Sequence, residues 1–454
     1  MMVVAQLIIG GGPVRALEDK RDATSQTQYD DVMIEFGPLS PAPDSQESET
    51  ARLPFTCKGS LYSGGSFNII HQPNAPGPTD HRGLSGLKVG ARFNIESQFS
   101  SSWAFHVGGA GCHDFVFKIF QDKGFTDAYT DQNENELEFD EVWIRAALGR
   151  LVNLKMGRQT VRWGKAVTIE VLDVLSPKDY RILGLADIED LSLPVCMTRM
   201  SLNSKAMSLN LMGLHEVRFN KIPVYGSDFY PAQSPAPDQQ VPESNLENTQ
   251  VGISLDVYRH QFDFSLNGAS YFQDRMYLAT DQGTRVRRHS RVNLLGGSFS
   301  VAVGSLVLYG ETAYLQGLDF HNTDAPKDRW DLLAGLEYNG IKDTVISAEA
   351  ANRYLLKFEA PLNASPDNAV ENEFRMVANL KRDFFYNTLH FGYQLSWYAL
   401  DGSGGAYQRF RLDYDMTDHW VVTGGVIFYE SGDYFLLQNI GDNDRLFFNI
   451  SYAF

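Results

Sequence analysis

The sequence predicts an all-β protein, a transmembrane antiparallel up-and-down β-barrel of about 18 strands, within a range of roughly 16 to 20. From about Leu84 onward, apolar residues recur at every second position, which places them on one face of a strand. Short turns alternate with long polar connections along the same stretch. No uninterrupted apolar run reaches the roughly 18 residues that a membrane-spanning helix needs. Strands are therefore expected to cross the membrane, and a closed barrel leaves no unpaired strand edge in lipid.

Composition excludes other classes of protein. The 454 residues include 39 Gly, 21 Tyr and 29 Phe, and the formal net charge is −17. No window has the Ala, Leu, Glu and Lys content that builds long helices. The acidic balance argues against a nucleic-acid-binding protein, because such proteins need basic patches. Cys57, Cys112 and Cys196 stand in none of the spacings of metal or redox motifs, and we expect isolated thiols packed as small hydrophobes.

The N-terminal region divides into two predicted parts. Residues 1–16 resemble a secretory signal peptide, with an apolar core and a small-residue cleavage site ending at Ala16. The basic n-region is missing, which a start codon placed too far downstream would explain; the alternative is a short buried strand. Residues 17–53 are polar and acidic, and we expect a flexible extension or a small plug. Residues 54–454 form the predicted barrel.

Eight hairpins are predicted in order along the barrel. They join 87–95 to 103–107, 142–148 to 152–156, 195–203 to 207–211, 251–257 to 262–266, 295–303 to 306–315, 330–338 to a strand after Asn339-Gly340, 374–380 to 385–399, and 410–414 to 420–428. A first strand near 55–62 and a last strand at 446–454 complete the set.

Long polar connections separate the hairpins. They cover 65–83, 121–136, 164–194, 217–249, 273–287, 317–329, 357–370, 400–406 and 430–443. Outer-membrane barrels have this alternation of short periplasmic turns and long extracellular loops.

Aromatic residues lie at strand ends, where rings favour the headgroup level of a membrane, as at Trp330, Tyr338, Trp397, Tyr414 and Trp420. The last strand is apolar at every second residue up to Phe454. It resembles the C-terminal recognition strand of Gram-negative outer-membrane proteins, and the resemblance implies that Phe454 is an assembly signal read by the barrel-assembly machinery. The alternative is an ordinary final strand.

The residues that alternate with the lipid-facing set are expected to line the lumen. Candidate inward cations are Arg145, Lys155, Arg375, Arg409, Arg411 and Arg445, and candidate inward anions are Glu337, Glu349, Glu373 and Asp413. Charges of both signs predict a hydrated channel, because a dry lumen would make each unpaired charge costly. Alternatively, these charges pair with one another and only brace the wall.

Segment 156–194 carries a motif. It contains Gly157, Arg158, Gln159, Trp163 and Gly164, followed by Ser176, Pro177, Lys178 and Asp179. In this the chain resembles a large, mostly uncharacterised family of proteobacterial outer-membrane barrels marked by Gly-Arg-Gln-x3-Trp-Gly and an Asn/Asp-Pro-x-Asp segment. It departs from the family in having Ser176 where Asn is usual and Lys165 where an acidic residue is common. The motif covers about forty residues, and the hairpins extend the resemblance to the whole barrel.

The third long connection, about 164–194, is expected to fold into the lumen, as third loops of porins typically do. Its aliphatic residues Val171, Leu172, Val174, Leu175, Ile182, Leu183 and Leu185 would be unnecessary in a loop exposed to the medium. The predicted pore-lining residues of this region are Arg158, Arg162, Lys165, Asp173, Lys178 and Asp179.

The start of this segment has two possible conformations. Strict alternation from Val152 turns Arg158 and Arg162 toward lipid, which is costly. A bulge at Gly157 instead turns both arginines inward, near Asp173 and Asp179, and turns Val161 and Trp163 outward. We expect the bulge.

The sequence contains no complete enzyme or metal-binding motif among those considered. His215-Glu216 lacks the second histidine of a zinc pair, Gly157–Lys165 has the wrong spacing for a phosphate loop, and no Gly-x-Ser-x-Gly elbow exists. Asp131, Asn133 and Asn135 begin like a calcium loop that Glu136 interrupts. The acidic run 127–141 is expected to be a solvated loop, with a weak divalent-ion bridge to lipopolysaccharide as the alternative. No cofactor, metal site or catalytic residue is predicted.

The expected function is passive passage of small solutes through the outer membrane of a Gram-negative bacterium, in contact with its lipid and lipopolysaccharide. Selectivity would come from the third loop and the lumen charges. The alternative is an outer-membrane component of a lipid or hydrophobic-compound export system, in which residues 18–53 could bind a periplasmic partner. An outer-membrane lipase is a third hypothesis, for which only His289-Ser290 offers a neighbouring pair.

Overall fold

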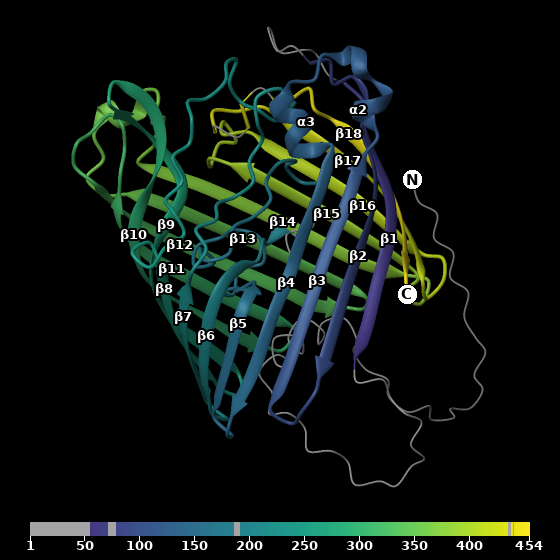
Figure 1. The fold of residues 1–454 in the computed structure, drawn as a ribbon, viewed down its shortest axis with the longest axis vertical. Helices are drawn as coiled ribbons and strands as arrows, with labels where there is room; N and C mark the ends of the chain where they lie inside the picture. The colour runs from purple at the N-terminus through teal and green to yellow at the C-terminus, as the bar shows by residue number, and fades with distance from the viewer. Residues whose placement is uncertain (1–54, 71–78, 186–190, 435–436, 439) are drawn as a thin grey trace, which may run out of the picture. The chain divides into compact units, whose positions relative to one another are not determined.

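The computed structural model describes residues 55–70, 79–185, 191–434, 437–438 and 440–454. Its strands form one antiparallel sheet of 18, in which each strand pairs with the next in sequence and β1 pairs with β18 (Figure 1). The sheet is therefore a closed up-and-down barrel, and the predicted fold and strand number are confirmed. The signal peptide at 1–16 and the extension at 17–53 lie outside the described residues.

The strands have the following bounds: β1 Thr56–Asn68, β2 Gly83–Gln98, β3 Trp103–Asp114, β4 Asn135–Leu148, β5 Val152–Gln159, β6 Val195–Asn203, β7 Met207–Leu214, β8 Gln250–Tyr258, β9 Phe262–Asp281, β10 Thr284–Val303, β11 Leu306–Leu318, β12 Lys327–Ile341, β13 Thr344–Leu355, β14 Asn372–Phe384, β15 Leu389–Tyr398, β16 Ala406–Asp415, β17 Trp420–Glu430 and β18 Arg445–Ala453.

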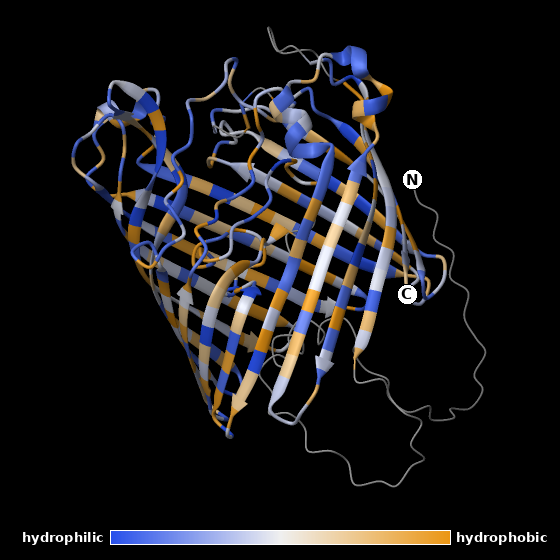
Figure 2. Ribbon diagram, in the orientation of Figure 1, coloured by the Kyte–Doolittle hydropathy of each residue, from blue (hydrophilic) through white to orange (hydrophobic). Residues whose placement is uncertain are grey.

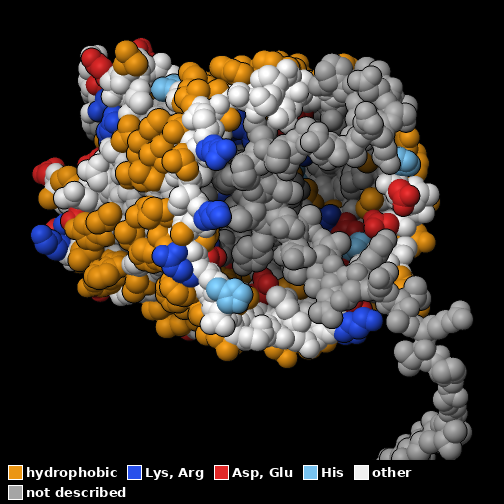
Figure 3. Space-filling model, turned by 90° about the horizontal axis from the view of Figure 1, so that it is seen from below, with side chains coloured by type: hydrophobic (Ala, Val, Ile, Leu, Met, Phe, Trp, Pro, Cys, Tyr) orange, Lys and Arg blue, Asp and Glu red, His pale blue; other side chains and the backbone are white. Residues whose placement is uncertain are grey.

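Alternation decides which face of each strand is outside. On β18, Leu446 and Phe448 are each 50% exposed, whereas Arg445 and Phe447, which alternate with them, are buried. The same two-residue period is visible along the strands in Figure 2, and apolar side chains gather over the outer surface in Figure 3. The outer face is the apolar one, as a barrel in lipid requires.

Three predicted boundaries are wrong. The expected loop 273–287 is the continuation of β9 and β10, joined at Gln282 and Gly283, both with positive φ. Backbone pairing continues there although the apolar alternation fades, which is why the pattern did not show it. Residues Asn339 and Gly340 lie inside β12, whose turn is at Lys342 and Asp343. Residues 385–388 form a turn, not the start of a strand, because Phe385, Tyr386 and Asn387 have positive φ.

The acidic run 127–141 is also not a loop. It forms helix α3, Asp127–Asn133, followed directly by β4. Thr126 caps the helix by accepting a hydrogen bond from the Tyr129 amide. Further short helices are α2 Val116–Ile119, η1 Gln121–Lys123 and η3 Ala360–Asn363. None of the described helices is long and apolar enough to span a membrane.

The barrel closes where the first and last strands meet. Gly59 and Phe454 exchange two backbone hydrogen bonds of 2.9 Å, just beyond the β1–β18 pairing. The Phe454 ring lies against Gly59, where a Cβ atom would stand 2.5 Å from the ring. A side chain at this position would displace the Phe454 ring.

Candidate functional site

The described parts of the third loop, residues 160–185 and 191–194, follow β5 and lie inside the barrel. Two glutamates on the inner faces of β11 and β13 accept hydrogen bonds from its backbone. Glu349 accepts from the amides of Val167 (2.5 Å), Thr168 (3.0 Å) and Ile169 (2.8 Å), and from the hydroxyl of Tyr309 (2.9 Å). Glu349 is 3% exposed. The carboxylate therefore satisfies three consecutive loop amides that would otherwise be buried without partners.

Glu311 accepts hydrogen bonds from the loop backbone on both sides of that stretch. It accepts from the amides of Lys165, Ala166 (2.6 Å) and Leu172 (3.3 Å), and it is 4% exposed. Gly164 has a φ of +90° and packs so closely on this carboxylate that no Cβ atom would fit. Glu311 was not predicted from the sequence. The available signal was its inner-face position on a strand that is two removed from the strand of Glu349.

Apolar packing holds the same stretch of loop. Val161, Trp163, Ile169, Val171, Leu172 and Leu175 are buried in one cluster with inner-face residues of β6 to β14. The wall supplies, among others, Met197, Val292, Leu315 and Leu333. We call the inner face of β6 to β13, covered in this way, the packed wall.

The loop then reaches the opposite side of the barrel. Ile182, Leu183 and Leu185 pack against a second cluster, built from Tyr407, Ile427, Tyr429 and Phe447 of β16 to β18 and Phe229 of the next long loop. The Tyr429 hydroxyl donates to the carbonyl of Leu183 at 2.5 Å. Residues 161–185 therefore contact both sides of the barrel interior.

The charges of the loop form their own ion pairs. Lys178 Nζ lies 2.5 Å from Asp173 and 3.5 Å from Glu170. Burial alone would lower the pKa of Lys178, but these carboxylates outweigh it and raise that pKa. Asp179 pairs with Arg181 at 2.5 Å, and Arg181 reaches Glu136 of β4 at 2.8 Å. Burial would raise the pKa of Asp179, but the hydrogen bond from Arg181 outweighs it and lowers that pKa.

The predicted bulge at Gly157 is wrong. Pairing of β5 with β4 and with β6 runs without a shift through Gly157, whose φ is +124° and whose missing Cβ leaves room for the Val142 carbonyl. Val161 and Trp163 are consequently buried inside and not turned outward. Arg158 shares the face of the exposed Met156, and its guanidinium lies 3.2 Å from Glu216 and donates to the Pro194 carbonyl.

The expected partners of the two arginines are wrong as well. Asp173 is bonded to Lys178 and to the Trp163 amide, and Asp179 to Arg181. Arg162 is exposed. The strand keeps its regular alternation through Gly157 because it needs no extra residue to reach the loop.

Most other predicted lumen residues are paired. Lys155 is buried, 3.7 Å from Glu141 and over the ring of Trp143, which Arg145 also approaches. The remaining contacts are Lys165 with Asp263 at 3.7 Å, Arg375 with Glu373 at 2.5 Å, Arg411 with Asp413 at 2.7 Å, Arg445 with Asp228 at 2.6 Å, Arg409 over the Phe447 ring, and Glu337 with Asn339. These pairs fit the alternative in which charges brace the wall.

A different part of the inner surface is exposed. On β1 to β4, the inward positions include Lys58, Arg92 and Glu96, which are all exposed. The Arg92 side chain is 51% exposed even though it lies 3.3 Å from Asp140, itself 31% exposed. We call the inner face of β1 to β4 the open wall. Sequence reasoning missed Arg92, because the alternating pattern alone does not say which inner faces the loop covers.

No group of three or more His, Cys, Asp or Glu side chains in the described ranges is arranged to hold a metal ion. The three cysteines are free thiols, with Cys57 and Cys196 exposed. The geometry therefore provides a lumen, a loop that crosses it, and one exposed polar wall.

Comparisons with known proteins agree with this architecture. A family model described as "Protein of unknown function (DUF1302)" matches residues 84–454. No curated protein matches the chain.

Among solved structures, the chain is similar to three outer-membrane porins. These are Acinetobacter baumannii OccAB1 (TM-score 0.52, 10% identity, 88% of this chain and 96% of that one), Pseudomonas aeruginosa OccK8, also called OprE (0.51, 10%, 88% and 98%), and Pseudomonas aeruginosa OccK5, also called OpdH (0.50, 10%, 88% and 97%). At this identity the likeness shows the fold alone, which is that of a porin.

Proposed function

The chain belongs to the family described as "Protein of unknown function (DUF1302)", and from its geometry we propose that it is a porin-like channel of the Gram-negative outer membrane. Small solutes pass through it passively, between the third loop and the open wall. The third loop and the charges of the open wall set the selectivity.

The exposed charges of the open wall carry this proposal. Lys58, Arg92 and Glu96 point to the inside of a closed barrel and are nevertheless exposed. Buried charges without solvent are costly, so side chains of this kind belong in water. Inner faces that are polar and hydrated are typical of barrels that form aqueous channels. Arg92, Asp140 and Glu96 bring both signs to this surface, which suits polar solutes.

The fixed position of the third loop supports a defined constriction. Six amide hydrogen bonds to Glu311 and Glu349 and the buried apolar cluster hold residues 161–175 on the packed wall. A loop held in this way narrows the barrel at a fixed position.

The alternative function is export of a lipid or hydrophobic compound. Such a route needs an apolar surface along the lumen. The apolar inner-face residues, however, are covered by the loop's own side chains, among them Trp163 and Leu172. Since the exposed inner surface is polar, the channel is the better supported function.

Ionic current through the purified protein in a planar bilayer tests the proposal. We expect steady, ohmic single-channel currents, and swelling of proteoliposomes in small neutral sugars. Heat-modifiable migration in detergent gels, and recovery with the outer membrane, check the barrel and its location. A folded barrel that passes neither ions nor sugars, but binds a fluorescent fatty acid, contradicts the channel and supports the alternative.

A further inference from the structure

A groove lies on the lipid-facing surface of the barrel, outside the proposed channel. It has a volume of about 650 Å³, within the range of small-molecule sites, and it lies over β6 to β9. Two paired rows form it. The first row is Thr198, Gly213, Val251 and Ser270, and the second is Met200, Leu211, Ile253 and Gly268.

The groove exists because two of the outward-facing residues are glycines, which have no side chain. Gly213 and Gly268 occupy outward positions where the neighbouring strands carry Leu211, Val251 and Ile253, which are 37% to 49% exposed. The large apolar side chains are therefore the walls of the groove, and the glycines are its floor. Such an apolar hollow suits a hydrocarbon chain.

The interior keeps the groove open. Behind its floor, the inward Gly252 packs so tightly that a Cβ atom would stand 2.8 Å from Leu175 and 3.1 Å from Trp163 of the third loop. Met197 and Met212 of the same part of the wall are buried in the same cluster. Because the wall is supported from inside, the groove exists before any ligand binds, which lowers the cost of binding.

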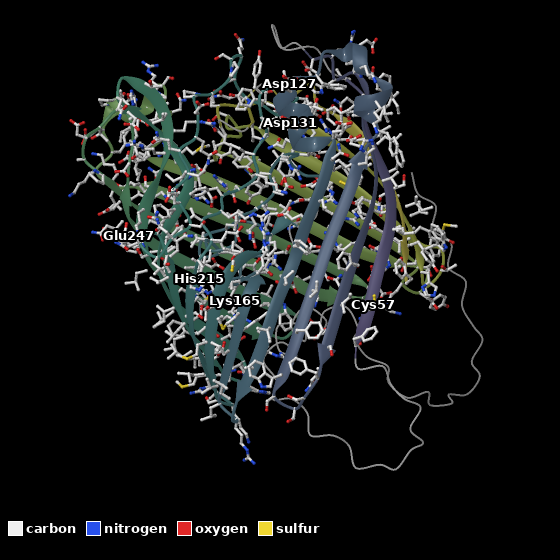
Figure 4. All side chains as sticks on the ribbon, in the orientation of Figure 1. Cys57, Asp127, Asp131, Lys165, His215 and Glu247 are labelled. Carbon is white, nitrogen blue, oxygen red and sulfur yellow. The ribbon has the colours of Figure 1, made fainter. Side chains whose placement is uncertain are left out.

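A histidine and an arginine stand at one end of the groove. His215 and Arg291 are exposed one row beyond Thr198 and Ser270, toward the long connection 215–249 (Figure 4 labels His215 and Glu247 on this side). The nitrogen Nε2 of His215 is 3.0 Å from the hydroxyl of Thr198. Arg291 lies over the Phe272 ring and donates to the carbonyls of Glu247 and Thr249.

Arg291 supplies an anion-binding group at this end of the groove. In the described part of the chain, Arg291 has no carboxylate partner, whereas the nearby Glu216 is already paired with Arg158 at 3.2 Å. An exposed guanidinium held by carbonyls retains donors for a phosphate, with which Arg forms strong paired hydrogen bonds. The long connections mark the extracellular side, so the headgroup belongs to the outer leaflet.

We propose that this groove binds one acyl chain of a lipopolysaccharide molecule, whose lipid A phosphate lies against Arg291 and His215. The acyl chain fills the hollow over Gly213 and Gly268. The same combination of basic side chains and an apolar surface recognises lipid headgroups in other membrane proteins.

Native mass spectrometry of the detergent-purified protein, mixed with lipid A, tests the site. We expect one lipid A per barrel. Gly213→Leu should fill the groove, because a Cβ there meets only His215 at an ordinary 3.7 Å, and should weaken retention about tenfold. Arg291→Gln should weaken it by a similar factor by removing the phosphate contact. If Gly213→Leu fails to assemble, Ser270→Leu fills the same row.

Matched controls separate this site from general effects. Gly424→Leu adds the same side chain to the outer face of β17, where a Cβ meets nothing within 4 Å. Arg259→Gln removes a charge from the turn at the other end of β8 and β9. Both controls should retain lipid A like the unchanged protein, and heat-modifiable migration confirms that each variant is folded.

Several results would overturn the proposal. Absence of bound lipid A, or equal loss in the groove variants and their controls, removes the site. Equal retention of phosphatidylethanolamine, unaffected by Arg291→Gln, removes the lipid A phosphate from it. Full displacement of lipid A by inorganic phosphate alone, with no effect of Gly213→Leu, shows an anion site without an acyl chain.

Discussion

The packed wall and the open wall follow the same alternating pattern, yet their inner faces differ in exposure. On the packed wall, inward Ser298, Glu311 and Glu349 are 2% to 4% exposed. On the open wall, 51% of the surface of the inward Arg92 side chain is exposed. Alternation fixes only which residues point inward. The third loop then decides which inner face is dry and which is left to water.

The largest effect is expected from releasing the loop from the packed wall. Glu311→Ala combined with Glu349→Ala leaves six loop amides without their charged acceptors, each such bond being worth about 1.5–3 kcal/mol. We expect single-channel conductance to rise several-fold. Glu337→Ala is the matched control, since this inner-face carboxylate of β12 accepts a hydrogen bond from Asn339 and, among the described residues, from no loop amide. Equal conductance in all three proteins would show that the loop does not depend on the two glutamates.

Stability should distinguish the interior cluster of the packed wall from the outer face of the barrel. Trp163 is 8% exposed within the interior cluster, and Trp103 is 43% exposed on the outer face of β3. Trp163→Ala should lower the free energy of unfolding in detergent by about 3 kcal/mol, as for other buried aromatic residues. In Trp103→Ala, detergent fills the space of the lost ring, and the free energy of unfolding should fall clearly less. Similar losses would mean that the cluster does not hold the loop.

Among single charge changes on the inner face, one on the open wall should alter ion selectivity more than one on a buried residue. Arg92→Glu reverses an exposed inner-face charge beside Asp140, and we expect the permeability ratio to shift toward cations by roughly twofold at low salt, with less effect at high salt. The reversal potential under a salt gradient measures it. Lys155→Gln alters a buried charge at the edge of the loop and should shift the potential less. A larger shift for Lys155→Gln would reverse the assignment of the two surfaces.

The smallest expected effect is a change in channel current at acidic pH. Arg181 holds the pKa of Asp179 below its usual value of about 3.9, so the stabilisation from their pair is complete above that value and is lost as pH falls through the lowered pKa. Current fluctuations should therefore increase below about pH 4. Asp179→Asn should show them already at neutral pH. Asp401→Asn is the control, because Ser403 lowers the pKa of this exposed turn residue without any contact to the loop.

Much of the barrel was predictable from local pattern. Alternating residues such as Leu446, Phe448 and Ile450 predicted strands, their outer face and the strand number. The pattern failed where backbone pairing does not depend on it, as in the extension of β9 and β10 to Gln282. It also placed a turn at Asn339, inside β12.

The site was predictable only in part. The sequence indicated that residues 171–185 need an apolar environment and that Glu349 points inward. It did not indicate Glu311 or Arg92, since their roles depend on where the loop lies in space. The bulge at Gly157 was inferred to keep Arg158 from lipid, but Glu216 and the Pro194 carbonyl satisfy this side chain without one.

Accessibility of two engineered thiols tests most directly that solutes pass along the open wall. In a background with Cys57, Cys112 and Cys196 replaced by Ser, Asn94→Cys places a thiol on the inner face of β2, and Ser298→Cys places one on the inner face of β10, where Ser298 is 2% exposed. A charged, membrane-impermeant thiol reagent is added during single-channel recording. We expect stepwise loss of current with Asn94→Cys and none with Ser298→Cys. Block through Ser298→Cys, or an unchanged current with Asn94→Cys after mass spectrometry confirms its modification, would contradict the account.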